Sequence, residues 1–494
     1  MRVLVTGATG YIGGRLVPEL LARGHEVRCV ARTPDKLDGR PWRDQVEVAE
    51  CDVFDRPSLD AAVAGCDAVY FLIHSMDGED AFAERDRQAA ANVRDACAAA
   101  GVSRIVYLGG LGDEDDDLSE HLRSRHEVGA VLADGPVPVT ELRAAIIIGS
   151  GSASFEMLRN LVEVLPVMTT PRWVGTRVQP IGVRDVLHYL CEVLEVDRTA
   201  GQVIGVGGPD VMSYQELMQV YAEISGLGRR LIVPVPVLTP GLSSLWIGLV
   251  TPLPPGLARP LVESLVNEVV VRGDTADRLM PHETLPFRET VRLALERVQD
   301  LDVATTWAGA TRARRDGSPD PEDPQTSDPG WSGGTVFTDR RTARSAASPE
   351  QLFATVCEVG GDRGYGRRDW LLQVRGVADR MVGGVGLRRG RPHPSELAVG
   401  DQVDFWRVEA VDRPHLLRLR AEMKLPGDAW LEFRVRPAED GRGSVLEQLT
   451  RFHPKGLSGR LYWGASLPLH RLGFASLADE LAADAARGAA STAG

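Results

Sequence analysis

Short apolar runs alternate with amphipathic runs over the first 150 residues of the chain. The apolar runs have the length of buried strands, and the runs between them carry apolar residues at helical spacing or are rich in alanine. The expected strands are residues 2–5, 26–31, 46–51, 68–73, 104–108 and 140–148, and the expected helices are residues 13–23, 81–100 and 122–132. Strands separated by helices favour a parallel sheet with right-handed crossovers, so this part of the chain is expected to be an α/β domain.

The pattern is less regular between residues 150 and 300, where helices are expected at 185–195 and 214–225. We interpret this region as a smaller substrate subdomain that completes a first domain of residues 1–300. The segment 314–330 then contains four prolines and five acidic residues with almost no apolar residue. Such a composition cannot bury a core, so residues 301–334 are expected to be a flexible linker.

Beyond the linker the hydrophobic period changes from helical spacing to strict alternation. Alternation at 417–423 and 429–436, and a strand-like run at 335–343, predict a half-buried antiparallel sheet. Ser348 begins a helix, with proline at the first helical position and glutamine three residues after the serine. An apolar helix at 467–483 is expected to close a second, α+β domain of residues 335–484, and residues 485–494 are expected to be a disordered tail.

Composition narrows the possible functions. The 494 residues carry a net charge of −13, which argues against broad nucleic-acid binding because that needs a basic face. None of the six cysteines forms a CxxC pair and the first residues lack an apolar signal core, so we expect free thiols, no zinc site and a cytoplasmic protein. The acidic run at 113–117 is interpreted as a solvated loop, with a metal site as the alternative, and no metal is assigned.

One uncharged segment complicates this picture. Residues 231–258 carry no charge but contain six prolines, and only residues 241–251 are free of proline. A membrane-spanning helix needs about 20 continuous apolar residues, which this segment lacks. We expect a loop and a short helix here, with shallow membrane contact or an apolar substrate entrance as the alternative.

The strongest chemical signal is a glycine-rich turn between the first strand and the first helix. Gly7 permits the tight turn, Gly10 allows the backbone to approach a pyrophosphate, and Gly13 allows the helix to pack closely on the strand. The free N–H groups at the start of the helix attract an anion. The motif that predicts dinucleotide binding is Thr6-Gly7-Ala8-Thr9-Gly10-Tyr11-Ile12-Gly13.

The end of the second strand indicates which dinucleotide is bound. An acidic residue that binds the ribose hydroxyls is usual for NAD, but this chain has Arg32 there, with Lys36 close behind. An arginine can bind a 2′-phosphate through a charge-assisted fork, so NADP is favoured over NAD. A surface cation is the alternative for Arg32, and Arg15 could add to the same positive field.

Residues at the ends of the third and fourth strands complete the expected cofactor site. Asp52 could accept a hydrogen bond from the adenine amino group while Val53 lines the ring, although a helix or turn cap is the alternative. Leu72 and Ile73 end the fourth strand, at the carboxyl edge where ligands bind in such sheets.

Together these residues resemble the extended and atypical branches of the short-chain dehydrogenase/reductase superfamily over about residues 1–300. The resemblance implies a Rossmann-type sheet and hydride transfer by a serine, a tyrosine and a lysine. This chain has Gly109 and Gly110 where the serine is expected, His121 at the tyrosine position and Arg125 at the lysine position. We expect Arg125 to hold the nicotinamide ribose and His121 to donate a proton, with the neighbouring cation lowering the pKa of His121. His126 or Glu127 could act instead, and the alternative is a degenerate site without catalysis.

The second half resembles the helix-grip domains of the START and polyketide-cyclase type, which implies a curved sheet around a cavity. Arginines 388, 389 and 391 form its most basic run, interpreted as a solvated loop or an acid-binding site. Trp406, Trp430, Tyr462 and Trp463 either line a cavity for an apolar ligand or pack in the core. The matching segments are 382–391, 405–407, 424–427 and 461–463.

These observations give one leading hypothesis and two alternatives. The leading hypothesis is an NADPH-dependent oxidoreductase acting on a neutral, apolar carbonyl compound or lipid-like molecule. The first alternative is a sensor that binds NADP(H) without turnover and has a ligand-binding second domain. The other is an accessory protein peripheral to the membrane.

Overall fold

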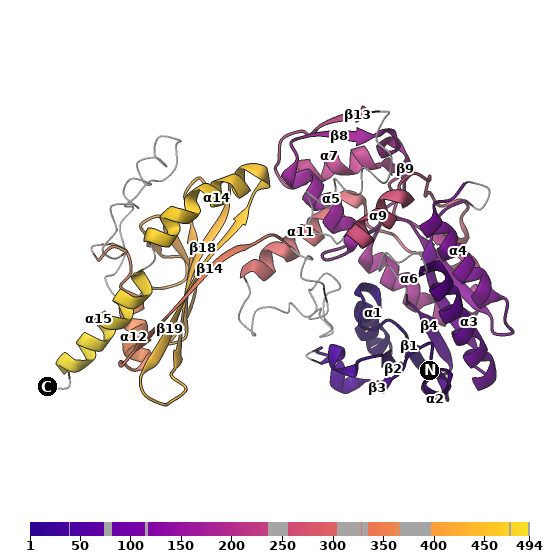
Figure 1. Cartoon of the computed structure of the whole chain (residues 1–494), viewed down its shortest axis with the longest axis horizontal. Coiled ribbons are helices and arrows are strands. Elements are labelled where there is room, and N and C mark those ends of the chain that lie inside the picture. The colour runs from indigo at the N-terminus through magenta and orange to yellow at the C-terminus, as the bar shows by residue number, and fades with distance from the viewer. Residues whose placement is uncertain are drawn as a thin grey trace. The chain divides into compact units, whose positions relative to one another are not determined.

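The computed structural model describes most of the chain, and its two compact units are residues 1–333 and 334–494. Figure 1 shows each unit with its own sheet and helices. The described residues are 1–38, 40–73, 82–113, 117–235, 255–303, 328, 334–361, 363–365, 397–473 and 476–492.

A seven-stranded parallel sheet forms the centre of the N-terminal unit. Its strand order is β11-β6-β5-β4-β1-β2-β3, and every neighbouring pair in it is parallel. The first six strands have the order 3-2-1-4-5-6 of a Rossmann-type sheet. The strands are β1 (Arg2–Val5), β2 (Glu26–Ala31), β3 (Glu47–Glu50), β4 (Ala68–Phe71), β5 (Arg104–Gly110), β6 (Val139–Ala144) and β11 (Val203–Val206).

Helices cover both faces of this sheet. α1 (Tyr11–Ala22) and α6 (Val183–Glu195) share one apolar core with the sheet. On the other face α2 (Arg56–Val63), α3 (Phe82–Ala100) and α4 (Glu120–Ala133) pack side by side and close a second core. The central strand β1 is buried on both faces because it is apolar, and its Val3, Leu4 and Val5 are all fully buried.

A smaller subdomain with its own core follows the carboxyl end of the sheet. This subdomain contains three two-stranded ladders in addition to its helices. The ladders pair β10 with β7, β12 with β9, and β13 with β8. The strands are β7 (Ile147–Ile148), β8 (Val167–Pro171), β9 (Arg177–Val178), β10 (Ile181–Gly182), β12 (Met212–Ser213) and β13 (Leu231–Val235). The helices are α5 (Ala153–Val164), α7 (Tyr214–Ile224), α9 (Pro255–Ser264), α10 (Thr275–Leu279) and α11 (Phe287–Val303).

The C-terminal unit is an α+β domain built on a six-stranded antiparallel sheet. Its strand order is β14-β19-β18-β17-β16-β15, and β18 and β19 pair over eleven residues each. The strands are β14 (Phe337–Ser345), β15 (Gln402–Val403), β16 (Trp406–Asp412), β17 (Leu416–Ala421), β18 (Gly427–Pro437) and β19 (Ser444–Pro454). Alternate residues of β18, such as Leu431, Phe433 and Val435, face the apolar core.

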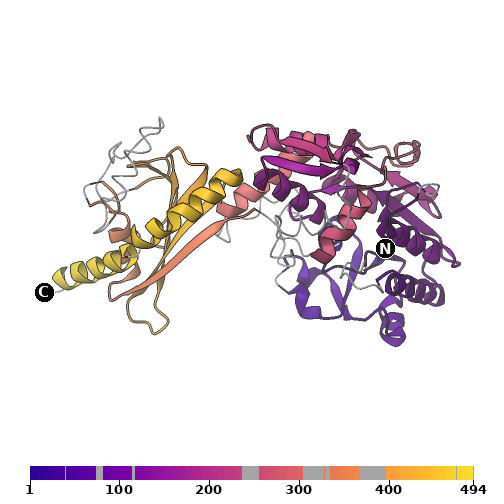
Figure 2. The same ribbon diagram turned by 45° about the horizontal axis from the view of Figure 1, so that its top comes forward.

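Three helices of the described residues accompany this sheet. α12 (Pro349–Val356) begins with the predicted capping box, in which Ser348 and Gln351 bond each other's backbone N–H groups. α14 (Gly456–Gly473) contacts β19, and α15 (Leu477–Thr492) lies along β14 (Figure 2). The prediction of a single helix at 467–483 is therefore wrong, because α14 ends at Gly473 and α15 begins at Leu477. α15 also continues to Thr492, through most of the stretch expected to be a disordered tail.

Several other expectations can be compared with the described residues. No helix among them is both long and apolar enough to cross a membrane. The uncharged segment contributes β13 and α9, while its residues 236–254 lie outside the description. All six cysteines are buried free thiols. Residues 114–116 of the acidic run and residues 382–391 also lie outside the described residues.

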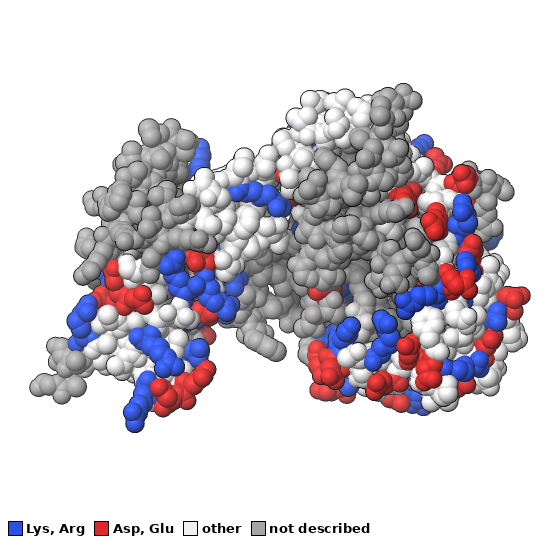
Figure 3. Space-filling model, in the orientation of Figure 1, with Lys and Arg blue, Asp and Glu red and all other residues white. Residues whose placement is uncertain are grey.

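The surface charge of the described residues is mixed in sign. On the face shown in Figure 3, acidic and basic side chains lie next to one another in both units. The basic run at 388–391 is outside the description, so its proposed roles stay predictions.

Candidate functional site

The glycine-rich turn has the tight geometry that the sequence predicts. Gly7 adopts a left-handed conformation with φ of 71°, and a Cβ atom there would lie 2.7 Å from the carbonyl oxygen of Leu72. A Cβ atom on Gly13 would overlap the carbonyl oxygen of Gly7. Both positions therefore require glycine, because any side chain would push α1 away from β1 and β4.

The start of α1 suits a phosphate group. Gly10 is its N-cap and supplies no side chain that could bond the first N–H groups of the helix. Neither aspartate nor glutamate occurs in the first turn, so the positive end of the helix dipole is not neutralised there. These features fit the diphosphate of a dinucleotide, which the backbone N–H groups of this turn would hold.

Thr6 connects the turn to the end of β4 through two hydrogen bonds. Its hydroxyl donates to the carbonyl oxygen of Tyr70 at 2.8 Å and accepts from the N–H of Leu72 at 3.0 Å. Thr6 is not among the residues predicted to bind the cofactor, although it directly follows the first strand within the motif.

A cavity of about 360 Å³ begins at this turn and extends along the carboxyl ends of β5 and β6 into the subdomain. Among the described residues no carboxylate lines it, and Arg125 is the only lysine or arginine in that lining. The lining residues are Gly7, Gly10, Tyr11, Ile12, Gly13, Leu72, Ile73, Leu108, Gly109, Gly110, Leu111, His121, Leu122, Arg125, Ala144, Ala145, Ile146, Ile147, Ser152, Ala153, Ser154, Met157, Tyr214, Leu261, Ser264, Leu265 and Val269. The cavity therefore joins the expected cofactor cradle to an apolar end in the subdomain.

The two residues at the expected proton-transfer positions both line this cavity. His121 is 8% exposed at the start of α4. Arg125 lies one turn further along, and its guanidinium donates to the carbonyl oxygen of Leu108 at 3.3 Å. The structure thus brings His121 and Arg125 together beside the end of β5, as the spacing predicts.

The two alternatives to His121 do not line the cavity. The Nε2 atom of His126 is 3.0 Å from the carbonyl oxygen of Gly110. Glu127 forms an ion pair with Arg87 of α3 at 2.5 Å. These contacts favour His121 as the group that can reach a bound molecule.

A buried carboxylate packs against Gly109, one of the two glycines where the serine was expected. A Cβ atom on Gly109 would lie 2.7 Å from Oε1 of Glu141 on β6, and the same carboxylate leaves no room for a Cβ atom on Gly129 of α4. Arg143 holds the Glu141 carboxylate at 2.7 Å. The space that a serine side chain would need is therefore already filled.

The residues predicted to bind the adenosine half lie outside the cavity lining. Arg32 and Lys36 are exposed and form no ion pair among the described residues. Thr9 of the glycine-rich turn is half-buried and also does not line the cavity. Both cations remain accessible to an anion, but their role in binding stays a prediction.

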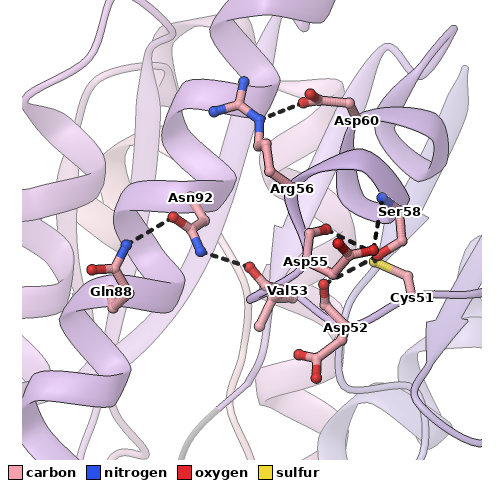
Figure 4. A network of polar contacts seen from close by, with 9 residues as sticks. All are labelled: Cys51, Asp52, Val53, Asp55, Arg56, Ser58, Asp60, Gln88 and Asn92. Atoms are coloured by element: carbon pink, nitrogen blue, oxygen red, sulfur yellow. Dashed lines mark hydrogen bonds and ion pairs between the residues drawn. The ribbon is translucent and has the colours of Figure 1, made fainter.

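Asp52 and Val53 have local structural contacts that Figure 4 shows. The carbonyl oxygen of Val53 accepts a hydrogen bond from Asn92 of α3 at 2.8 Å, and the Asp52 carboxylate accepts from the N–H of Phe54 at 3.1 Å. The Asp52 side chain is turned away from the Arg56–Asp60 ion pair (Figure 4). The turn-cap alternative for Asp52 is thus supported, while an adenine contact stays a prediction.

Comparison with known protein families agrees with this geometry. Residues 7–143 match a family described as NAD(P)H-binding. The N-terminal unit is thus similar to NAD(P)H-binding domains, and its sheet has the Rossmann-type strand order. Residues 331–477 match a family described as a protein of unknown function (DUF2867).

Individual proteins are also similar to the Rossmann domain. A (4-alkanoyl-5-oxo-2,5-dihydrofuran-3-yl)methyl phosphate reductase of Streptomyces griseus is 29% identical over 269 residues, which are 53% of this chain and 85% of that protein. A 3 beta-hydroxysteroid dehydrogenase/Delta 5-->4-isomerase of Mycobacterium tuberculosis is 40% identical over 116 residues, 22% of this chain and 30% of its own length. Among solved structures, the triphenylmethane reductase of Citrobacter sp. complexed with NADP(H) is 22% identical with a TM-score of 0.48, covering 60% of this chain and 100% of its own.

Proposed function

We propose that this protein is an NADPH-dependent reductase of a neutral, apolar carbonyl compound. The observation that carries the proposal is the cavity of about 360 Å³ that joins the glycine-rich cradle to a largely apolar end, with no carboxylate among the described lining residues. A cavity with an apolar lining and few polar groups suits an apolar substrate. The similarity to the Streptomyces griseus reductase along 85% of that protein supports a reduction rather than another use of the cofactor.

Residues of this chain would divide the work of the reaction. NADPH, when bound, supplies the hydride that forms a C–H bond at the carbonyl carbon. The electron pair of the C=O π bond then moves to the oxygen, which takes a proton from His121 or from water. Arg125 would hold the nicotinamide ribose at the end of β5, where its guanidinium lies. His121 suits a proton donor because it lines the cavity and histidine titrates near neutral pH.

The preference for NADPH over NADH rests on Arg32 and Lys36. Both are exposed just after β2, where the 2′ position of the adenine ribose is recognised in this type of domain. A guanidinium forms a bidentate pair with a phosphate group, whereas it gains less from a ribose hydroxyl.

The proposed substrate class follows from the lining residues. Leucine, isoleucine, methionine and valine side chains line the substrate end of the cavity together with alanines, three serines and Tyr214. The Streptomyces griseus protein is named for a substrate that contains an alkanoyl group and an oxo-dihydrofuran ring, and also a phosphate group, which the proposed class lacks. A ketone or an unsaturated ketone with an apolar body is the matching class for this chain.

We propose that the C-terminal unit is a helix-grip domain that binds or shelters an apolar molecule. Its antiparallel sheet and long terminal helices support this assignment. Trp463 stacks between Phe337 and Phe452, and Trp406 and Trp430 are also buried, so these aromatic side chains pack in the domain.

The alternative function is a sensor that binds NADP(H) without turnover. Gly109 favours it, because the Glu141 carboxylate fills the place of the serine hydroxyl that polarises substrates in catalytic relatives. The sensor would bind NADPH, but it would not reduce any carbonyl compound and would leave NADPH unoxidised.

Oxidation of NADPH, followed by its absorbance with a panel of apolar ketones and unsaturated ketones, tests the proposal. We expect turnover with NADPH that exceeds turnover with NADH, and a reversed preference in Arg32→Asp. Arg436→Asp in the C-terminal unit is the matched control for the change in net charge. Tight NADPH binding without turnover of any compound in the panel would instead support the sensor.

A further inference from the structure

Asn267 connects the subdomain to the chain that leads into α4. It lies between α9 and α10 and is 8% exposed. Its amide oxygen accepts a hydrogen bond from the backbone N–H of Ser119 at 2.9 Å, and its amide nitrogen donates to the carbonyl oxygen of Asp117 at 3.0 Å. Both polar ends of this side chain are therefore bonded to backbone groups directly before the helix.

The contact with Ser119 acts on the first turn of α4. Ser119 is the N-cap of the helix, and its hydroxyl accepts from the N–H of Leu122 while Asn267 holds its own N–H. His121 is the second residue of the helix and lines the cavity. Because the N-cap determines where the first turn begins, a displacement of the cap would also displace His121.

The two ends of α4 pack in different cores. Val128 and Leu132 belong to the core between the sheet and α3, whereas Leu122 and the preceding Leu118 belong to the core of the subdomain. The parallel sheet thus fixes the later turns of the helix, while the subdomain fixes its first turn. The place of His121 relative to the sheet therefore depends on contacts from the subdomain.

The segment that contains Asn267 also forms part of the cavity wall. Leu265 and Val269, two residues to either side of Asn267, both line the cavity. Arg272, further along the same segment, forms an ion pair with Asp113 in the loop that precedes α4. One short stretch of the subdomain therefore lines the substrate end of the cavity and holds the start of the helix that carries the proposed proton donor.

We propose that Asn267 is a positioning residue that fixes the first turn of α4 and thereby holds His121 toward the carbonyl oxygen of a bound substrate. This inference rests on the proposed function, because Asn267 acts on the reaction through His121. Without its two hydrogen bonds, backbone groups at the helix start would lose their partners and the first turn would shift. A misplacement of about 1 Å in a reacting group costs about 100-fold in rate.

Asn267→Leu tests the inference, because leucine is similar in size but has no polar side-chain atom. It should lower kcat for ketone reduction by about 10–100-fold. The dissociation constant of NADPH should be unchanged, since the cradle lies at β1 and α1 and Arg125 is bonded to the Leu108 carbonyl oxygen of β5. Asn267→Asp keeps an acceptor for the Ser119 N–H, so it should retain more of kcat than Asn267→Leu.

Hydrogen-exchange mass spectrometry reads the same contact without turnover. The peptide that contains Ser119 should exchange its amide hydrogens faster in Asn267→Leu than in the wild type, because the Ser119 N–H loses its acceptor. This measurement shows directly whether the start of α4 depends on Asn267.

A double-mutant cycle with His121→Gln separates positioning from a merely structural role. If Asn267 acts through His121, Asn267→Leu should not lower kcat further in His121→Gln, because no side-chain proton donor is left to position. A structural role would instead lower kcat by the same factor in both backgrounds.

Gln219→Met is the matched control in the subdomain. The Gln219 amide also bonds two backbone groups, the N–H and the carbonyl oxygen of Arg230, but it lies outside the described cavity lining. This variant should lower the melting temperature and leave kcat unchanged.

Four results would overturn the inference. They are an unchanged kcat in Asn267→Leu, an unchanged kcat in His121→Gln, equal losses of kcat in both backgrounds of the cycle, and unchanged exchange of the peptide that contains Ser119. The proposed function fails separately, if the wild type oxidises NADPH with no ketone, and the inference then falls with it.

Discussion

The guanidinium of Arg15 forms a bidentate ion pair with the carboxylate of Asp328. NH1 lies 2.9 Å from Oδ1 and NH2 lies 2.7 Å from Oδ2, and the two side chains are 1% and 6% exposed. Arg15 also lies over the ring of Tyr11, at 4.0 Å from its centroid, so the pair is next to the glycine-rich cradle. An acidic residue of the predicted linker is thus buried against the first helix of the Rossmann domain.

Replacing Asp328 by asparagine should destabilise the N-terminal unit by about 3–5 kcal/mol, because it leaves a buried guanidinium without its counter-charge. Burial lowers the pKa of the nearby Arg40 to about 10, and the negative charge of Asp328 opposes that shift. The variant therefore also removes an attractive charge from Arg40. Chemical denaturation measures the change. The control is Asp60→Asn, which breaks the exposed pair with Arg56 and should cost less than about 1 kcal/mol.

Substitution of the cradle glycines should abolish NADPH binding. Gly13→Ala places a methyl group on the Gly7 carbonyl oxygen and moves the start of α1, so titration calorimetry should show no heat from NADPH. Gly24→Ala is the control, because Gly24 has φ of 79° but nothing lies within 4 Å of its added Cβ atom. It should cost about 1 kcal/mol of stability and leave the affinity for NADPH unchanged.

Replacing His121 by glutamine should lower kcat for ketone reduction by about 10²–10⁴-fold, the usual contribution of a positioned proton donor. The dissociation constant of NADPH should be unchanged. His126→Gln is the matched control five residues along α4, because His126 contacts Gly110 and does not line the cavity. Equal kcat values for His121→Gln and the wild type would leave water as the proton source.

The C-terminal unit should lose stability in acid through Glu432. Its carboxylate is 1% exposed and contacts Arg418 at 2.8 Å and Arg434 at 2.5 Å. Burial alone would raise the pKa of Glu432, but the attraction of these arginines and of Arg451 outweighs it and lowers the pKa below its ordinary value. A carboxylate with a lowered pKa stabilises the fold above its unfolded pKa, and the stabilisation is lost as the pH falls through the folded value.

Glu432→Gln should therefore be about 3–5 kcal/mol less stable than the wild type at pH 7, with the difference shrinking below about pH 4. Denaturation curves of the full chain between pH 7 and pH 2 measure it. Glu447→Gln on the neighbouring strand, whose partner Arg340 is exposed, should change stability by less than about 1 kcal/mol across the same range. A constant difference between Glu432→Gln and the wild type would contradict this account.

Much of the Rossmann domain could be predicted because its signals are local. The strand at 26–31 is where the alternation of apolar runs places it, and Gly7 and Gly13 are fixed by turn geometry within a few residues. The helix α2 was missed because its eight residues, Arg56–Val63, carry few apolar side chains. The boundary between α14 and α15 was missed because both helices are apolar enough to read as one.

The parts of the site that the sequence did not reveal depend on contacts between distant residues. Tyr214 follows a capping box, which predicts a helix start but not that the residue lines the same cavity as His121, far earlier in the chain. The pairing of Arg15 with Asp328 spans 313 residues, and a proline-rich acidic segment gives no pattern that could indicate it. The exposed position of Arg32 agrees with the expected phosphate contact, which stays a prediction.

The packing of Glu141 against Gly109 constrains any attempt to rebuild the standard catalytic set in this protein. Gly109→Ser alone would drive the new hydroxymethyl group into the Glu141 carboxylate, and trimming Glu141 alone would strand Arg143 without its anion. A serine at position 109 would thus call for compensating changes at Glu141 and Arg143, besides a tyrosine and a lysine at positions 121 and 125. An engineered serine–tyrosine–lysine set in this sheet would therefore need a rebuilt packing layer between β5 and β6 as well as the three catalytic side chains.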